Sequence, residues 1–125
     1  MWKKALALLP VALLLSGCAG TFTNLTSLQQ PRNANNLYNV EVAFNSRQQS
    51  MRWDSIKPSV LVNGESYAMR PTLLMGDRWE ASIPVPAGTN LISYRYKFDY
   101  QYNSFGPPKS DSAYSPAYKL HVVDQ

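Results

Sequence analysis

The thiol of Cys18, the only cysteine of the chain, is the side chain best suited to covalent chemistry. A thiolate is a nucleophile and a metal ligand, but a lone cysteine cannot form a disulfide within its own chain. Cys18 follows Lys3, Lys4 and an apolar run of eleven residues, 5–15. A basic start, about 7–15 apolar residues and a small-residue cleavage site are typical of a signal peptide. The run is too short to cross a bilayer as a helix, which takes about 20 residues.

Leu15-Ser16-Gly17-Cys18 resembles the lipobox of bacterial lipoproteins, an aliphatic residue and two small residues before a cysteine. The resemblance implies that the Cys18 thiol is diacylated, that the chain is cut before Cys18, and that the new amino group is acylated. Several acyl chains make a stable membrane anchor. Ala19 stands where Asp would retain an enteric-type lipoprotein in the inner membrane, which implies delivery to the outer membrane, facing the periplasm. The alternative is an ordinary signal peptide, cut near Ala19-Gly20.

Other catalytic chemistry has little support. His121 is the only histidine, and we expect it to face solvent. The eight acidic residues are spread singly, and the chain has no nucleophile elbow, histidine pair or glycine-rich phosphate loop. Without Lys3 and Lys4, ten scattered basic residues remain against eight acidic ones, which does not favour nucleic acid as a partner. We therefore expect that the protein is not an enzyme and that it binds no cofactor and no metal.

The elements after residue 36 predict an all-β chain. Val40, Val42 and Phe44 alternate with other residues, which predicts a strand with one buried face. Asn63-Gly64 stands between residues 59–62 and 65–69, and Gly76-Asp77 stands between residues 72–75 and 78–85; each pair predicts a hairpin whose two arms are strands. Trp79 is expected to be buried in the strand 78–85, and the remaining expected strands are 51–53, 91–103, and 117–123 with Leu120 and Val122 inward; residues 104–116 are expected to form a loop.

Seven or eight short strands in about 90 residues are typical of an immunoglobulin-like sandwich, in an early-set or fibronectin-like variant. A small closed barrel is the alternative. The expected domains are a signal peptide over 1–17, the lipidated cysteine and a flexible tether over 18–36, and the β-sandwich over 37–125.

Aromatic residues occupy every second position of the long strand, from Tyr94 to Tyr102, which places them on one face of a sheet. We expect Tyr94, Tyr96 and Phe98 to lie in the core. A strand of thirteen residues is longer than a small sandwich is expected to cover, because typical strands have about 5–6. We therefore expect an aromatic rim beyond the core, formed by Tyr100, Tyr102, Phe105 and Tyr114.

Four segments together resemble the second half of early-set glycogen-binding domains, which precede isoamylase-type catalytic domains and occur in AMP-activated kinase β subunits. They are Met69, residues 76–80, residues 83–88 and residues 94–99. The resemblance implies a sandwich fold. The family's glucose-stacking segment is not found near residues 62–67, so the resemblance does not extend to that sugar site.

These observations predict a non-enzymatic, lipid-anchored envelope protein that binds another envelope protein, as an accessory subunit. The alternative is a glycan-binding lipoprotein that uses the aromatic rim.

Overall fold

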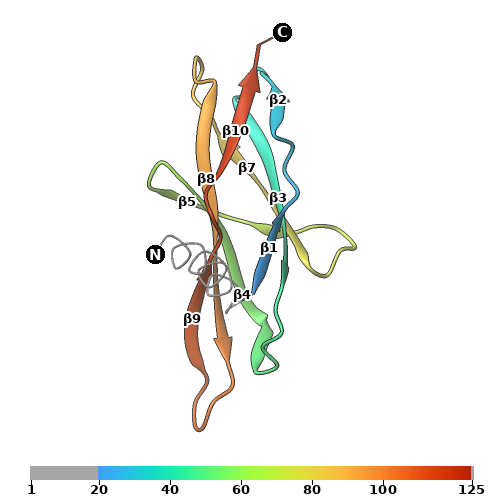
Figure 1. The fold of residues 1–125 in the computed structure, drawn as a ribbon, viewed down its shortest axis with the longest axis vertical. Coiled ribbons are helices and arrows are strands. Elements are labelled where there is room, and N and C mark those ends of the chain that lie inside the picture. The colour runs from blue at the N-terminus through green and yellow to red at the C-terminus, as the bar shows by residue number, and fades with distance from the viewer. Residues whose placement is uncertain (1–19, 125) are drawn as a thin grey trace, which may run out of the picture.

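The computed structural model describes residues 20–124, which form two β-sheets packed face to face. Cys18 and the expected signal peptide lie outside these residues. The small sheet has the order β1-β3-β7-β6, and the large sheet has the order β2-β10-β8-β4-β5, with β9 paired to β8 (Figure 1). The strands are β1 (Thr21–Asn24), β2 (Gln29–Pro31), β3 (Leu37–Asn45), β4 (Met51–Val62), β5 (Glu65–Ala68), β6 (Arg70–Pro71), β7 (Arg78–Pro84), β8 (Leu91–Tyr102), β9 (Lys109–Tyr114) and β10 (Tyr118–Val123).

The alternating patterns place the expected side chains in the core between the sheets. Every second residue of β3 and β7 is buried, and the buried set includes Trp79, which is 7% exposed. Leu120 and Val122 point inward, as their pattern predicts. Two packed layers of strands with apolar inner faces are the way in which antiparallel sheets bury their alternating residues. The sequence prediction of an all-β sandwich is confirmed.

The Asn63-Gly64 pair forms the predicted hairpin between β4 and β5. Asn63 has φ 52° and Gly64 has φ 80°, the positive values that a two-residue type I′ turn requires. The second predicted hairpin also exists, but its first arm is β6, and residues 72–75, which were expected to be a strand, belong to the β6–β7 loop.

Strand β4 covers residues 51–62, in which the sequence predicts two separate strands, 51–53 and 59–62. It pairs with β8 at both ends, and the register shifts between Arg52 and Lys57, which marks a β-bulge. The Ser55 hydroxyl holds this bulge, because it donates to the Arg52 carbonyl at 2.5 Å and accepts from the Gln101 amide at 2.8 Å. A bulge inserts unpaired residues and bends the strand, which explains why the alternation of β4 breaks between 52 and 57.

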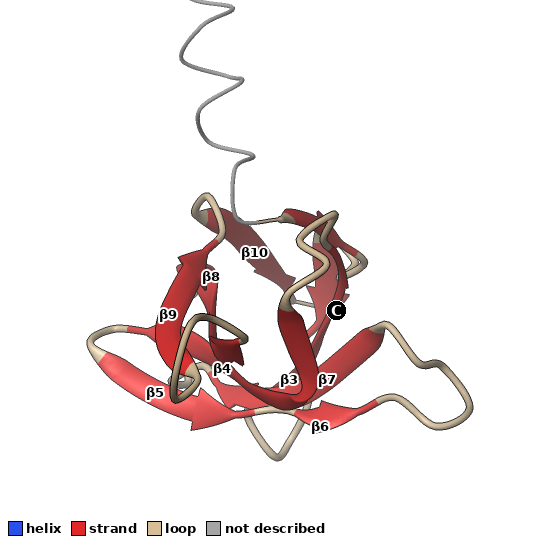
Figure 2. Cartoon of the chain, turned by 90° about the horizontal axis from the view of Figure 1, so that it is seen from below, coloured by secondary structure: helices blue, strands red, loops and turns tan. Residues whose placement is uncertain are grey.

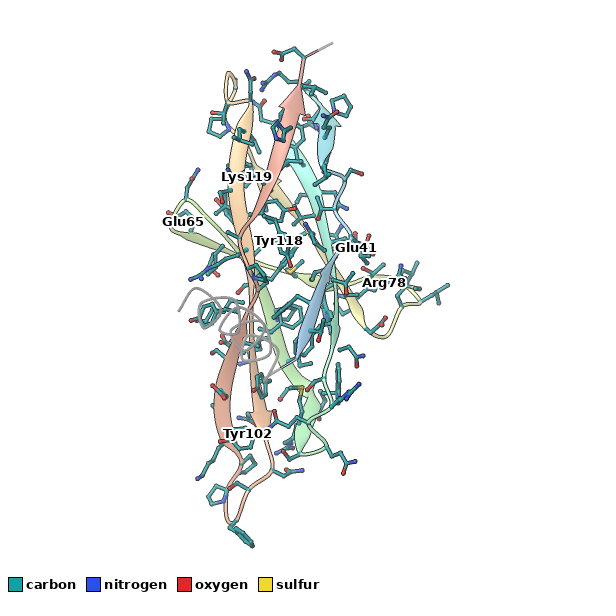
Figure 3. The ribbon with its side chains drawn as sticks, in the orientation of Figure 1. Glu41, Glu65, Arg78, Tyr102, Tyr118 and Lys119 are labelled. Atoms are coloured by element: carbon teal, nitrogen blue, oxygen red, sulfur yellow. The ribbon has the colours of Figure 1, made fainter. Side chains whose placement is uncertain are left out.

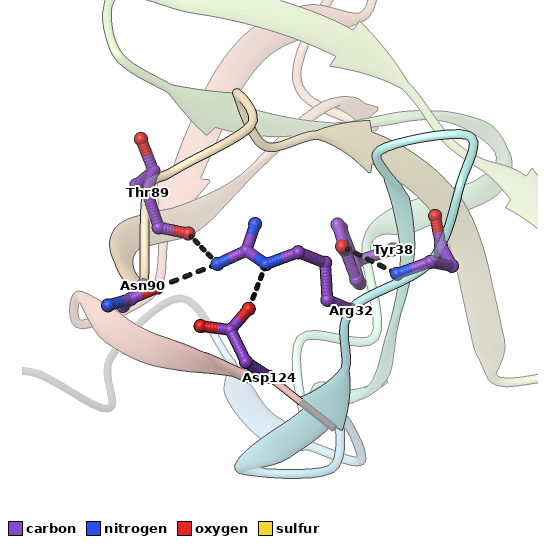
Figure 4. Close-up of polar contacts among 6 residues, drawn as sticks. Arg32, Tyr38, Thr89, Asn90 and Asp124 are labelled. Carbon is purple, nitrogen blue, oxygen red and sulfur yellow. Dashed lines mark hydrogen bonds and ion pairs between the residues drawn. The ribbon is translucent and has the colours of Figure 1, made fainter.

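The expectation of a flexible tether is wrong for residues 20–36. β1 pairs antiparallel with β3, and β2 pairs parallel with β10, so this segment supplies a strand to each sheet. Arg32 fastens its end: the guanidinium donates to Asp124 at 2.5 Å, to the Thr89 carbonyl at 3.0 Å and to the Asn90 side chain at 2.6 Å (Figure 4). Backbone pairing, polar side chains and the ring of Phe22, which packs against the core, order this segment, although its sequence has no hydrophobic periodicity.

Tyrosine hydroxyls from the core hold the middle of the same segment. Tyr94 accepts from the Asn24 amide at 2.8 Å, and Tyr96 donates to the Asn24 side-chain oxygen at 2.7 Å. Thr26 lies 3.1 Å from the Tyr96 hydroxyl and accepts from the Glu41 amide at 2.9 Å. Buried polar atoms need such partners, so the hydroxyls and the N-terminal segment satisfy each other.

Candidate functional site

The inner face of β8 is a stripe of buried aromatic rings. Tyr94, Tyr96 and Phe98 are 3% exposed or less, as predicted. Phe98 lies at the centre, with its ring centroid about 5 Å from those of Phe22, Phe44 and Trp79. These rings come from three strands of the small sheet, so Phe98 links the two layers.

Tyr100 also belongs to the core, and the expectation that it projects beyond the core is wrong. Its side chain is only 4% exposed. The physical reason is that the sandwich continues to the end of β8: β4 pairs with it as far as Met51 and Tyr102, and β9 pairs with its other edge. Burial raises the pKa of the Tyr100 hydroxyl, and the Asp111 carboxylate, which pairs across from it, raises that pKa further.

The other three residues of the expected rim lie in three different places. Tyr102, at the end of β8 (Figure 3), is half-buried and packs against the core. Phe105 lies in the β8–β9 turn and is fully exposed. Tyr114 ends β9 opposite Lys97, so its ring lies on the outer face of the large sheet. The four residues therefore do not assemble into one rim, and residues 109–114, expected to be loop, are strand.

The outer face of β8 carries the complementary set of side chains, and a groove of about 970 Å³ lies there. The groove lies between the β4 bulge and β9. Its lining residues are Asp54, Ser55, Ile56, Lys57, Asp99, Tyr100, Gln101, Ser110, Asp111, Ser112 and Tyr114. Most of these side chains carry hydroxyls, carboxylates, an amide or an ammonium group, so the groove offers many hydrogen-bonding groups.

Tyr114 is the aromatic wall of this groove and is 49% exposed. The Arg95 guanidinium lies 4.9 Å and the Lys97 ammonium 5.8 Å from its ring centroid. Cations at these distances are attracted by the ring electrons, so they hold the ring on the sheet surface. Beside it, Ser112 donates to Asp99 at 2.5 Å, and Lys97 lies 3.8 Å from the same carboxylate.

The β8–β9 turn, residues 103–108, forms the tip of a long hairpin at one end of the molecule (Figure 1). All six residues are exposed, and Phe105 presents its whole ring to solvent. The base of the tip is fixed, because the Asn103 amide donates to the Ser50 carbonyl at 2.8 Å. Gly106 has φ 86°, a value that favours glycine. The turn therefore presents one aromatic ring on a defined support.

The sequence identified Phe105 and Tyr114 but not the groove. The outward set Arg95, Lys97 and Asp99 follows from the same period of two that reveals the aromatic stripe. The groove also needs the β4 bulge and the strand β9, and neither has a clear pattern in the sequence.

Within residues 20–124, no group of three or more His, Cys, Asp or Glu side chains could hold a metal ion. His121 is exposed, as expected, and its backbone amide donates to the Leu28 carbonyl. The part of the chain that the structure describes contains no helix that is long and apolar enough to span a membrane.

Comparison with known proteins yields no further assignment: no family model, no curated protein and no solved structure matches the chain.

Proposed function

We propose that the protein is a lipid-anchored envelope protein of the outer membrane, facing the periplasm, and that it acts as a non-enzymatic binding module. The lipobox-like sequence ending at Cys18 supports the anchor. The strand orders support an immunoglobulin-like domain, because β1-β3-β7-β6 corresponds to the A-B-E-D sheet and β10-β8-β4-β5 to a G-F-C-C′ sheet.

The anchor is tested by exchanging Cys18→Ser, which removes the thiolate that the lipid donor requires. We expect the variant to leave the membrane fraction after a carbonate wash or to accumulate uncleaved, whereas the wild type stays in the membrane. A variant that stays in the membrane and is processed like the wild type contradicts the anchor.

The observation that carries the binding function is the exposed ring of Phe105 at the hairpin tip. Aromatic side chains supply much of the energy of protein interfaces, commonly about 2 kcal/mol or more for each anchor residue. A wholly exposed ring on a turn that is hydrogen-bonded at its base matches such an anchor. The partner that fits is a protein of the envelope with an apolar cavity for this ring, and the chain acts as its accessory subunit.

Phe105→Ala tests this assignment, with Lys119→Ala as the control on exposed strand β10. After crosslinking of intact cells, we expect the wild type and the control to co-purify one partner in equal yield. Phe105→Ala should lose most of it, with an unchanged melting temperature. Equal recovery with all three proteins contradicts a partner site at the tip.

A glycan is the second candidate ligand, and the outer groove favours it. Tyr114 offers a half-exposed ring for stacking on a sugar, and Asp99, Gln101 and Ser112 offer hydrogen-bonding groups around it. Binding of envelope glycans by the wild type, lost in Tyr114→Ala and kept in Phe105→Ala, would select this candidate. The reverse pattern would select the protein partner.

A further inference from the structure

The β6–β7 loop, residues 72–77, presents adjacent apolar side chains to solvent. Leu73 is 85% exposed, Leu74 is 94% exposed, and Met75 is exposed beside them. The loop projects sideways from the sandwich (Figure 1), and Figure 2 shows it next to β6. Its base is held by backbone hydrogen bonds, from Thr72 to the Arg78 carbonyl at 2.9 Å and from Met75 to the Thr72 carbonyl at 3.1 Å. The leucines are therefore displayed by an ordered turn.

Leu74 has φ 64°. This left-handed conformation suits glycine or asparagine and is unfavourable for leucine. Glycine or asparagine at this position would make the turn more stable than leucine does. A leucine that is both exposed and conformationally unfavourable indicates that its apolar side chain serves a contact outside the domain.

The loop lies close to the point where the chain leaves the expected anchor. β3 pairs on one edge with β1, through Thr21 and Asn45, and on its other edge with β7, through Ala43 and Arg78. Neighbouring strands lie about 4.8 Å apart, so the start of β1 and the base of the loop are separated by about 10 Å across β3.

Gly20 fixes the start of the described chain against β3. A Cβ atom on Gly20 would lie 2.5 Å from the Phe44 ring and 2.9 Å from the Asn45 carbonyl oxygen. Cys18 precedes Gly20 by two residues, which span at most about 7 Å. A lipid on Cys18 therefore brings the membrane surface to this end of the small sheet, where the β6–β7 loop also lies.

We propose that Leu73 and Leu74 insert into the lipid bilayer as a second membrane contact, in addition to the acyl chains on Cys18. The inference rests on the proposed anchor. Two separate contacts fix the face that the domain turns toward the membrane, which one flexible lipid attachment does not. The charges at the base of the loop balance: Arg70 pairs with Glu80 at 3.1 Å, and Arg78 neighbours Asp77. The contact therefore depends on apolar insertion and needs no anionic lipid.

The test uses the full-length protein, purified from membranes and reconstituted into phosphatidylcholine vesicles. Leu73→Cys carries an environment-sensitive fluorophore, and Leu28→Cys is the matched control, because Leu28 is another exposed leucine (71%) between β1 and β2. Cys18 is the only native cysteine and its thiol would hold the lipid. We expect a blue shift at position 73, and nitroxide lipids should quench that label by more than half. Position 28 should show neither effect.

Two results would overturn the inference, and they are distinguishable. If the vesicles float without the protein, the anchor fails and the loop contact fails with it. If the protein floats but the label at position 73 stays in water, only the loop contact is wrong. A blue shift that appears only after envelope proteins are added would assign the loop to a protein partner and also contradict bilayer insertion.

Discussion

The two faces of strand β8 differ in what they do, although they alternate along one backbone. The inner face presents Tyr94, Tyr96, Phe98 and Tyr100, all buried. The outer face presents Arg95, Lys97, Asp99 and Gln101, and part of it forms the floor of the groove beside Tyr114. Substitutions on the inner face should therefore change stability, and those on the outer face and at the hairpin tip should change binding.

Phe98→Ala should have the largest effect on stability. Phe98 is fully buried and touches three rings of the small sheet, so truncation opens a cavity and costs about 3–5 kcal/mol. A small domain has about 5–15 kcal/mol in total. Chemical denaturation measures the difference in the free energy of unfolding between the variant and the wild type. Lys97→Ala, one residue away on the outer face, should stay within about 0.5 kcal/mol; equal losses in both variants would contradict the division of β8 into two faces.

Tyr100→Ala should cost about 2–3 kcal/mol, because its ring is buried near the end of the sandwich. Tyr102→Ala should cost less, because Tyr102 is half-buried. The melting temperatures of the two variants show which substitution costs more stability. If Tyr100→Ala melts like the wild type, the core stops before Tyr100.

Tyr96→Phe removes the hydroxyl that binds Asn24 and lies near Thr26. Leaving buried polar atoms without a partner costs about 1–3 kcal/mol. We expect a similar loss of stability and faster proteolysis within residues 20–36, measured by limited digestion. Unchanged protection of this segment would show that strand pairing alone holds it.

Alkaline pH should destabilise the domain through the tyrosines of the inner face. Burial raises the pKa of the Tyr96, Tyr100 and Tyr118 hydroxyls. The folded state therefore keeps these protons more tightly than the unfolded state, in which tyrosine has a pKa of about 10. This contribution is complete below about pH 10 and is lost as pH rises through the folded values. Tyr118→Phe should flatten the decline of melting temperature above pH 10; an equally steep decline would contradict a contribution from Tyr118.

The sequence predicted those parts of the fold that a periodic pattern or a turn motif marks. Alternation identified β3, β7, β8 and β10, and the Asn63-Gly64 pair identified its hairpin. β1, β2 and β9 have mostly polar sequences without a periodic pattern. β1 and β2 pair with strands later in the chain, β3 and β10, whereas β9 pairs with β8, the strand before it.

The candidate site was less predictable because it depends on register. Tyr114 was identified as an interaction residue, but its pairing with Lys97 places it on the face opposite Tyr100. The β4 bulge, which forms one side of the groove, depends on a register shift with β8 that local sequence does not specify. The exposure of Phe105 could be predicted because it requires only that the residue lie in a turn outside the core, and the structure agrees with this expectation.

The most direct test of the binding proposal is site-specific photo-crosslinking in living cells. A photoreactive phenylalanine analogue replaces Phe105 in one strain and Lys119, on the exposed side of β10 (Figure 3), in another. We predict one defined crosslinked protein from position 105 and none from position 119. The absence of a crosslink at position 105, or the same products from both positions, would contradict a partner site at the hairpin tip.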